Sequence, residues 1–394
     1  MEACVKNQEL VIALGERIDY SNAGEVEAEL FDAVKEHPGL KLCLDADKML
    51  YISSAGLRIM MRLRKTCTAG FSIRNVSPAV YEIFDMTGMT EIIDVRKKRR
   101  RFETEGLPVI GTGASGTVYR LDEETALKVY KGGEEMLPVI EDEQKKARQA
   151  FLNGLPTAIP YDVVRVGEGY GVVFEMINAN NLAEIVQKEP SRLPEIIPEY
   201  ADFIKRLNSK EAHAGQPPFA RDIYLEALDT SFRPYLSGQV RERIRALLEG
   251  LPDDLHLLHG DIQLKNVMLS GDEMMLIDMD HMCTGNPVFE FAGLYVTYIA
   301  LNEVDPNDSL NFLGLDRETC AALFYGTLRE YLQAPDEDTL RLAEQKSRTA
   351  GYLRLLMLLI VERRIADSGK TERGIKHAVN RLGELIYEVQ DLAI

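Results

Sequence analysis

Cysteine is scarce in this chain of 394 residues, and the five that occur lie well apart. These scattered cysteines show no metal-ligand spacing. An odd number of cysteines without a secretory leader also argues against a disulfide framework. We therefore expect a reduced cytoplasmic chain, whose cysteines are Cys4, Cys43, Cys67, Cys283 and Cys320.

Long apolar runs and an excess of basic charge are also lacking. The most apolar run, residues 352–362, is too short to span a bilayer and contains Arg354, so we expect a buried core helix there. The N-terminus has no basic start followed by an apolar core, so no signal peptide is expected. The net charge of −17 disfavours a surface for nucleic acid or for an anionic membrane.

The remaining composition is that of an ordinary globular protein. Hydrophobic residues make up 45% of the chain, and its length suits two or three domains. One basic run, "RKKRRRF" at 96–102, interrupts the acidic sequence. Such a run can be a partner-binding patch, but a solvated linker or strand end is the preferred interpretation. We place a domain boundary there.

Strands and helices alternate before this boundary. Alternating apolar residues predict strands, helical spacing of apolar residues predicts helices, and capping residues and Gly88 mark helix ends. An alternation of this kind within about 95 residues predicts a small α/β domain. The predicted strands are 9–15, 40–45, 71–76 and 91–95, and the predicted helices are 21–37, 53–67 and 78–88.

After the boundary the chain is first β-rich and then helical. Strands are predicted at 107–111, 116–121, 126–130 and 169–177, with a helix at 138–152. From about residue 182 most segments have helical patterns. We therefore expect a small β-rich lobe followed by a larger helical lobe. The predicted domains are 1–98, a basic linker at 99–104, an N-lobe at 105–178 and a helical C-lobe at 179–394.

A glycine loop opens the β-rich lobe. It carries Gly111, Gly113 and Gly116, followed by Val118. Dinucleotide-binding folds and kinases both use this spacing, but a dinucleotide site needs a helix directly after the loop. Here "TVYRL", a polar turn and "ALKVY" follow, which predicts a hairpin and favours a kinase loop over ATP phosphates. A plain glycine turn in a sheet is the alternative.

Lys128 stands in the middle of the apolar strand "ALKVY". An ammonium group among apolar neighbours needs an anionic partner. ATP phosphates and a glutamate of the next helix would supply it, and Glu143 is the preferred glutamate, with Glu141 second. An edge-strand lysine exposed to solvent is the alternative interpretation.

The segment "LLHGDIQLKNVMLS" at 257–270 has the spacing of a phosphoryl-transfer loop. Asp261 can accept the proton of an attacking hydroxyl or orient that hydroxyl, and Asn266 offers a neutral oxygen to Mg²⁺. The strand "MMLIDMDH" then ends in Asp278 and Asp280, and magnesium prefers such hard oxygen ligands. His259 is expected to brace the loop rather than to carry a proton.

Residues 105 to about 300 resemble the kinase-like superfamily, most of all its aminoglycoside phosphotransferase and choline kinase branch. The matching text is "GTGASGTVYRL", "ALKVY", "HGDIQLKN" and "LIDMDHMCTGNPVFEFAGL". The resemblance implies a bilobal α+β fold and a phosphotransferase that depends on ATP and Mg²⁺. By position it implies a catalytic base at Asp261, metal ligands at Asn266 and Asp278, a phosphate clamp at Lys128, and an adenine-facing hinge from Glu175 to Ile177.

Several residues separate the branches of this superfamily. Protein kinases usually carry arginine before the catalytic aspartate and lysine two residues after it, where this chain has Gly260 and Gln263. The metal aspartate lies in "DMD", only a few residues before "GNP", which leaves no room for an activation loop. Both features favour a small-molecule acceptor. Two departures from that branch are Asn208, where histidine is frequent, and Glu290, where aspartate is usual.

Two serines stand at the start of a predicted helix in "YISSAGLRIM", residues 51–60. A helix N-cap explains one of them. With "GERIDYSNA", "LDADKMLYISSAGLR", "IRNVSPAVYEIFDMTGM" and "IIDV", residues 1–98 resemble a STAS domain, the fold of anti-sigma factor antagonists. In that family a partner kinase phosphorylates a serine at this turn and so controls binding. The matching position is Ser54, and Ser53 replaces the usual preceding aspartate.

The leading hypothesis is a kinase of a small hydroxyl- or amine-bearing molecule, regulated by the STAS-like domain. The alternative is an atypical protein serine kinase or anti-sigma factor antagonist in a partner-switching pathway, with Ser54 as the phosphosite. A third hypothesis is a binding module that sequesters an anti-sigma factor and senses nucleotide. The complete set of catalytic residues disfavours the third.

Overall fold

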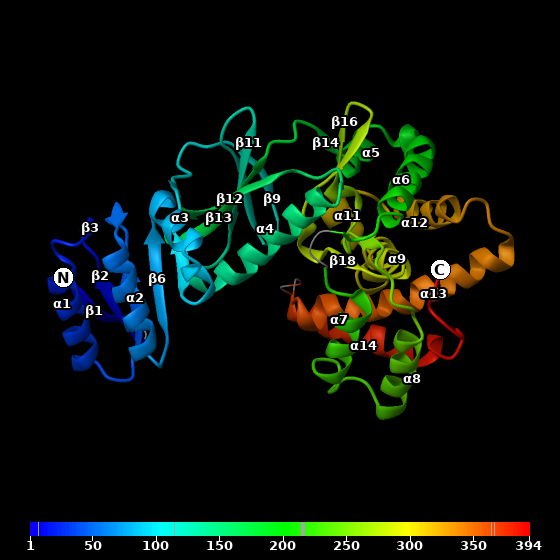
Figure 1. The fold of residues 1–394 in the computed structure, drawn as a ribbon. Helices are drawn as coiled ribbons and strands as arrows, with labels where there is room; N and C mark the ends of the chain where they lie inside the picture. The colour runs from blue at the N-terminus through cyan, green and yellow to red at the C-terminus, as the bar shows by residue number, and fades with distance from the viewer. Residues whose placement is uncertain (7, 114, 214–216, 364, 366) are drawn as a thin grey trace. The chain divides into compact units, whose positions relative to one another are not determined.

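The structure, a computed structural model, is drawn as a ribbon in Figure 1. It describes residues 1–6, 8–113, 115–213, 217–363, 365 and 367–394. The chain divides into two units, Met1–Phe102 and Glu103–Ile394. One hydrophobic core lies in the first unit, and the second unit has separate cores for its β-rich lobe and its helical lobe.

The N-terminal unit is built on one mixed sheet. Its strands lie in the order β1-β2-β4-β6-β7; β1 is antiparallel to β2 and the other neighbours are parallel. Parallel neighbours need crossover connections, which the helices supply. The strands are β1 (Ala3–Lys6), β2 (Glu9–Ala13), β4 (Lys41–Asp45), β6 (Phe71–Val76) and β7 (Asp94–Lys97); the helices are α1 (Ala23–Glu36), α2 (Ser54–Thr66) and α3 (Pro78–Met86).

The α/β prediction for this unit is confirmed, with two differences in detail. The last strand begins at Asp94 rather than at residue 91, because Met89–Glu91 form a 3₁₀ turn after Gly88, whose φ is +70°. Strand β1 was not predicted, since all four of its residues are exposed and it has no apolar alternation. A short parallel pair, β3 (Arg17–Ile18) and β5 (Tyr51–Ile52), leads into α2. The basic run 96–102 contributes the end of β7 and the short strand β8 (Arg101–Phe102).

The second unit begins with an antiparallel β-lobe. Its strands lie in the order β12-β13-β11-β10-β9, and helix α4 (Leu137–Leu152) packs against β12 and β13. The strands are β9 (Val109–Thr112), β10 (Gly116–Arg120), β11 (Thr125–Tyr130), β12 (Pro160–Val166) and β13 (Gly169–Glu175). The predicted strands are present, and β12 is an addition to them.

The rest of this unit is mainly helical, as predicted. A β-hairpin of β16 (Val267–Ser270) and β17 (Glu273–Leu276) interrupts it, with β14 (Asn180–Asn181) beside β16 and a separate pair of β15 (Leu257–Leu258) and β18 (Cys283–Thr284). The helices are α5 (Leu182–Lys188), α6 (Leu193–Asn208), α7 (Ala220–Asp229), α8 (Gly238–Glu249), α9 (Val288–Tyr295), α10 (Leu301–Val304), α11 (Asp308–Leu313), α12 (Arg317–Tyr331), α13 (Glu337–Leu356) and α14 (Ser368–Leu385).

Two π-helical segments extend these helices: Val296–Ala300 continues α9, and Met357–Val361 continues α13. The apolar run 352–362 lies at the second junction and is mostly buried, as the sequence predicts. Across the described ranges, no helix combines the length and the apolar character that a bilayer crossing requires.

We expect Phe84→Ala to destabilise the N-terminal unit. Phe84 on α3 has no exposed surface, so its truncation leaves a cavity and should lower the free energy of unfolding by about 3–5 kcal/mol. The matched control is Met86→Ala on the same helix, where 81% of the side chain is exposed and the change should stay within about 0.5 kcal/mol. Urea denaturation of both variants would measure the difference, and equal losses would contradict the prediction.

Candidate active site

The glycine loop joins β9 to β10, and the predicted hairpin that follows it, formed by β10 and β11, is present. Strand β10 pairs antiparallel with β11, and Val118 lies opposite Lys128. Gly116 must be glycine here, because a Cβ atom would lie 2.1 Å from the carbonyl oxygen of Val129. The amide of Gly113 donates to the carbonyl of Gly116 at 2.9 Å, while Ala114 of this loop falls outside the described residues. Gly111 lies opposite Val118 in the pairing between β9 and β10.

Lys128 binds two acidic side chains at once. Its Nζ donates to Oε1 of Glu143 on α4 at 2.6 Å, and to Oδ1 of Asp278 at 2.6 Å. Only 12% of the lysine side chain is exposed. Burial alone would lower the pKa of Lys128, but the charges of Asp278 and Glu143 outweigh burial and raise it. The ammonium therefore stays charged at any physiological pH and can clamp further anions.

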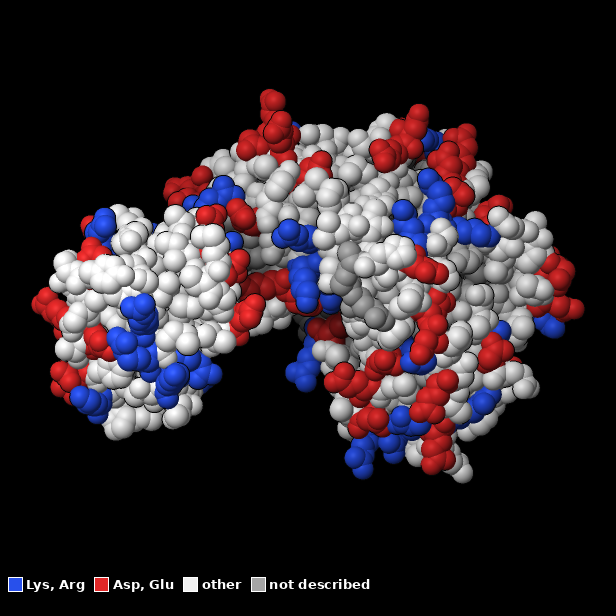
Figure 2. Space-filling view, in the orientation of Figure 1, with Lys and Arg blue, Asp and Glu red and all other residues white. Residues whose placement is uncertain are grey.

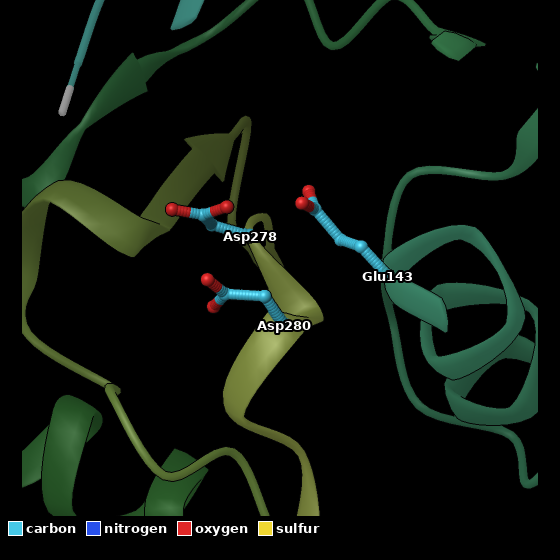
Figure 3. A group of neighbouring side chains, drawn as sticks. All are labelled: Glu143, Asp278 and Asp280. Carbon is cyan, nitrogen blue, oxygen red and sulfur yellow. The ribbon is translucent and has the colours of Figure 1, made fainter. Parts of the chain in front are cut away.

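Three carboxylates converge beside this lysine (Figure 3). One oxygen from each of Glu143, Asp278 and Asp280 lies within 4.8 Å of the others. Glu143 reaches toward the group from α4, and the two aspartates come from the turn after β17. Carboxylates this close repel one another unless a cation lies between them, and hard divalent ions prefer such oxygen ligands.

Asp278 is held in a left-handed conformation, with φ at +64° and ψ at +61°. A non-glycine residue pays for this conformation only where its surroundings enforce it, and such residues cluster at functional sites. The next acidic residue, Asp280, is tied to α4 because its carbonyl accepts from Lys146 Nζ at 2.9 Å. These constraints direct both aspartates toward Lys128 and Glu143.

Asp261 and Asn266 lie together on the loop between β15 and β16. The Asn266 Nδ2 donates to the Asp261 carbonyl at 2.8 Å and to its Oδ2 at 3.2 Å. The amide of Ile277, directly before Asp278, donates to the Asn266 carbonyl at 3.0 Å. The loop with Asp261 is therefore hydrogen-bonded to the segment that leads into Asp278 and Asp280. With its nitrogen engaged in this way, Asn266 would use Oδ1 as a ligand atom.

Glu290 supports the Asp261 loop, a role that the sequence analysis did not predict. It is 1% exposed on α9, and its carboxylate accepts from the amides of His259 and Gly260. Burial raises the pKa of Glu290, and the two amide donors oppose this rise. The sequence marks Glu290 only as a departure from the usual aspartate. The available signal was an acid inside the apolar segment "VFEFAGLY", because a buried carboxylate needs dedicated donors.

His259 braces the loop, in agreement with the expectation for it. Its Nδ1 accepts from the amide of Asp261 at 3.2 Å, and its Nε2 contacts the carbonyl of Ile277 at 3.0 Å. A carbonyl can only accept, so this network assigns the proton to Nε2 and a neutral ring. The imidazole thus links the loop to the strand that precedes Asp278.

The predicted hinge residues have partners within the protein. Glu175 ends β13; its backbone amide donates to the carbonyl of Ile159 at 2.9 Å, and its carboxylate accepts from the amide of Ile159 at 3.2 Å. The amide of Met176 donates to the carbonyl of Glu124 at 2.7 Å. An adenine contact along Glu175 to Ile177 stays a prediction.

The second departure from the family pattern, Asn208, is structural. It is 5% exposed at the end of α6, and its Nδ2 donates to the carbonyl of Leu257 at 3.0 Å. Asn208 therefore supports the strand that leads into the Asp261 loop.

Two cavities of the second unit lie away from the candidate site residues. One of about 420 Å³ includes Arg206 and Met274, and one of about 770 Å³ includes Tyr235 and Lys376. Neither is lined by any of the candidate site residues, so the chemistry is assigned from the ion pairs and hydrogen bonds rather than from cavity size.

We expect Gly260→Ala to destabilise the fold more than Gly271→Ala. Both glycines have positive φ, +79° and +63°, which costs an alanine about 1 kcal/mol or more at either position. Only at Gly260 would the new Cβ also meet a backbone atom, the His281 carbonyl oxygen at 2.5 Å. The expected loss there is about 3 kcal/mol, measured by chemical denaturation. Equal losses at both positions would refute the close contact.

Comparison with known protein families gives two matches. Residues 106–338 match the phosphotransferase enzyme family, and residues 1–121 match the STAS domain. The overlap at 106–121 lies in the second unit, where it covers β9 and β10. No curated protein matches the chain.

Among solved structures, a GDP complex of wild-type aminoglycoside 2'-phosphotransferase-IIIa is 13% identical, with a TM-score of 0.44, and the match covers 79% of this chain and 98% of that one. A choline kinase from Streptococcus pneumoniae is 15% identical, with a TM-score of 0.41, and the match covers 69% of this chain and 91% of that one. An anti-sigma factor antagonist from Thermotoga maritima is 14% identical, with a TM-score of 0.23, and the match covers 24% of this chain and 85% of that one.

The family match spans more than half of the sequence, so the chain belongs to the phosphotransferase enzyme family and is a kinase, with a STAS domain at its N-terminus.

Proposed function

We propose that the second unit transfers the γ-phosphoryl group of ATP, with Mg²⁺, to a hydroxyl or amine of a small molecule. The observation that carries this proposal is the convergence of Lys128, Glu143 and Asp278 beside the Asp261–Asn266 pair. Phosphoryl transfer depends on positioning and charge neutralisation, and these are the groups it requires.

The proposed nucleotide site uses the β-lobe. The glycine hairpin would cover the phosphates with its backbone amides, and Lys128 would bind two of them while Glu143 keeps the ammonium in place. Lys128 also binds Asp278 at 2.6 Å, so phosphate binding to the lysine would free that carboxylate. Asn266 and Asp278 would then hold Mg²⁺, which neutralises charge on the phosphates.

Asp261 is proposed to act on the acceptor. Its carboxylate would orient the attacking hydroxyl and accept the hydroxyl proton as the new O–P bond forms. The bond to the leaving ADP oxygen breaks in the same step. Asn266, which donates to Oδ2 of Asp261 at 3.2 Å, keeps the carboxylate in a fixed orientation.

The short connection between Asp278 and α9, which leaves no room for an activation loop, supports a small acceptor. Between Asp278 and α9 the chain forms only a 3₁₀ turn, Met279–His281, and the two-residue strand β18. Gly260, where protein kinases usually carry arginine, lies against the carbonyl of His281 and leaves no room for a side chain. Both features suit an acceptor that binds directly in the catalytic centre.

Asp261→Asn should abolish ATP turnover that depends on Mg²⁺. The amide cannot accept the proton, and we expect the rate to fall about 100-fold or more. The control is Asp272→Asn in the exposed β16–β17 turn, which should keep the wild-type rate. ATP consumption with a panel of aminoglycosides, amino alcohols and sugars would measure both variants and identify the acceptor. Normal turnover by Asp261→Asn would refute the proposed role.

A second candidate function, phosphorylation of Ser54, has specific support. Ser53 is the N-cap of α2 and accepts from the Gly56 amide at 3.4 Å, so the capping role falls to Ser53. Ser54 is exposed at the first position of the helix, and its hydroxyl binds the Tyr20 hydroxyl at 2.6 Å. A phosphate there would meet the helix N-terminus, and exposed Arg58 lies one turn further along the same face.

The charge of the two units fits partner binding at this helix. Residues 1–102 contain 16 basic and 15 acidic residues, whereas residues 103–394 contain 30 basic and 48 acidic ones. Figure 2 shows Lys and Arg side chains gathered over the N-terminal unit, in the region where Figure 1 places α2. The exposed basic residues of α2 are Arg58, Arg62, Arg64 and Lys65. An acidic partner surface would suit this helix, and phosphate on Ser54 would weaken its attraction.

Incubation with ATP and Mg²⁺ should add one phosphate to Ser54 if this second function operates. Intact mass and peptide mapping would detect it, and Ser54→Ala should remove it. The Asp261→Asn chain serves as the control that separates phosphorylation by this kinase from a contaminating activity. Absence of phosphate on wild-type Ser54, alone or with a separate STAS partner, would count against this function.

A further inference from the structure

Two buried tyrosines hold the middle of the Asp261 loop. The Tyr200 hydroxyl donates to the carbonyl of Ile262, and the Tyr298 hydroxyl accepts from the amide of Leu264 at 3.1 Å. The two phenol groups also lie close to each other. Tyr200 has no exposed surface and Tyr298 has 1%. The pair therefore connects two backbone groups that flank Gln263.

The chemistry of each group fixes the direction of these two hydrogen bonds. A carbonyl only accepts, so the Tyr200 hydroxyl donates to the carbonyl of Ile262. A backbone amide only donates, so the Tyr298 hydroxyl accepts from the amide of Leu264. Burial raises the pKa of both phenols, so both stay protonated and neutral.

The tyrosines come from two separate elements, Tyr200 from α6 and Tyr298 from the π-helical segment Val296–Ala300. Single π-helical turns inside α-helices are rare and occur frequently at functional sites. The carbonyl of Tyr298 accepts from Nδ2 of Asn302 at 3.0 Å, and Oδ1 of Asn302 accepts from the Ser309 amide at 3.0 Å. The widened turn that presents Tyr298 is thus secured by buried polar groups.

We infer that Tyr298 and Tyr200 are positioning residues for phosphoryl transfer, which set the orientation of Asp261 and Asn266 through the backbone between them. The carbonyl of Ile262 directly follows Asp261, and the amide of Leu264 lies two residues before Asn266. Glu290 and His259 already fix the loop on the other side of Asp261. The tyrosine pair supports the part of the loop between Asp261 and Asn266, the proposed Mg²⁺ ligand. The inference rests on the proposed function.

The test compares Tyr298→Phe with a matched variant, Tyr352→Phe, in the full chain. Tyr352 is also fully buried in the helical lobe, but its hydroxyl binds Glu303 rather than the loop. With ATP and Mg²⁺, and phosphate release to water or to the acceptor as readout, Tyr298→Phe should lower kcat about 10- to 100-fold. Its KM for ATP should stay within about twofold, because the loop does not form the proposed nucleotide clamp. Tyr352→Phe should keep the wild-type kcat.

Tyr200→Phe provides a second, independent variant, and the double variant tests the coupling. Because both hydroxyls hold backbone groups of the same short loop, the double variant should lose clearly less than the product of the two single losses. Hydrogen exchange at the Leu264 amide should accelerate in Tyr298→Phe and not in Tyr352→Phe. Wild-type kcat in Tyr298→Phe or Tyr200→Phe, equal losses in Tyr298→Phe and Tyr352→Phe, or multiplicative losses in the double variant would overturn the inference.

Failure of the proposed function can be distinguished from failure of the positioning role of the two tyrosines. A wild-type chain that turns over no ATP, alone or with any acceptor, would refute the proposed function and with it the catalytic role of the pair. The exchange rate of the Leu264 amide would still decide whether the tyrosines hold the loop.

Discussion

The double ion pair of Lys128, with Glu143 and with Asp278, is the interaction on which the second unit's candidate site depends. One ammonium group joins a strand of the β-lobe, the helix α4 and the turn that carries Asp278. Breaking a buried ion pair leaves an uncompensated charge, which costs about 3–5 kcal/mol in typical proteins. The same positive charge allows Glu143, Asp278 and Asp280 to lie within 4.8 Å of one another. The network therefore holds these side chains together through contacts within the protein itself.

The Asp261 loop depends on a different kind of constraint, the satisfaction of its buried backbone groups. Amides and carbonyls from His259 to Leu264 find partners in side chains, some of the loop itself and some of distant elements, rather than in a regular ladder. Buried polar groups without partners are costly, so a short irregular loop is rigid only when such partners exist. Glu290, His259 and the two tyrosines supply them. The catalytic geometry is in this sense a product of the helical lobe.

Much of the fold was predictable because its periodicity is local. The alternation of strands and helices before residue 98 and the "TVYRL"–"ALKVY" hairpin both follow from spacing and turn residues, and the structure contains them. Strand β1 and the π-helical segments were not predictable. The residues of β1 are all exposed, and a π-helical turn is set by packing rather than by intrinsic preference. Asp261, Asn266, Asp278, Lys128 and Glu143 were selected from the order of chemical groups along the chain, and the fold brings them together.

By itself, the sequence determined the kinds of chemical group and their order: a glycine hairpin, a lysine in an apolar strand, an aspartate and an asparagine five residues apart, and a closing pair of acids. Only the tertiary structure decided which groups touch. It paired Lys128 with Asp278 across 150 residues, placed Glu290 under Gly260, and linked Tyr200 to the loop through Ile262. Local patterns follow from neighbouring residues, whereas contacts between distant residues depend on how complete lobes bury their apolar surface and satisfy their polar groups.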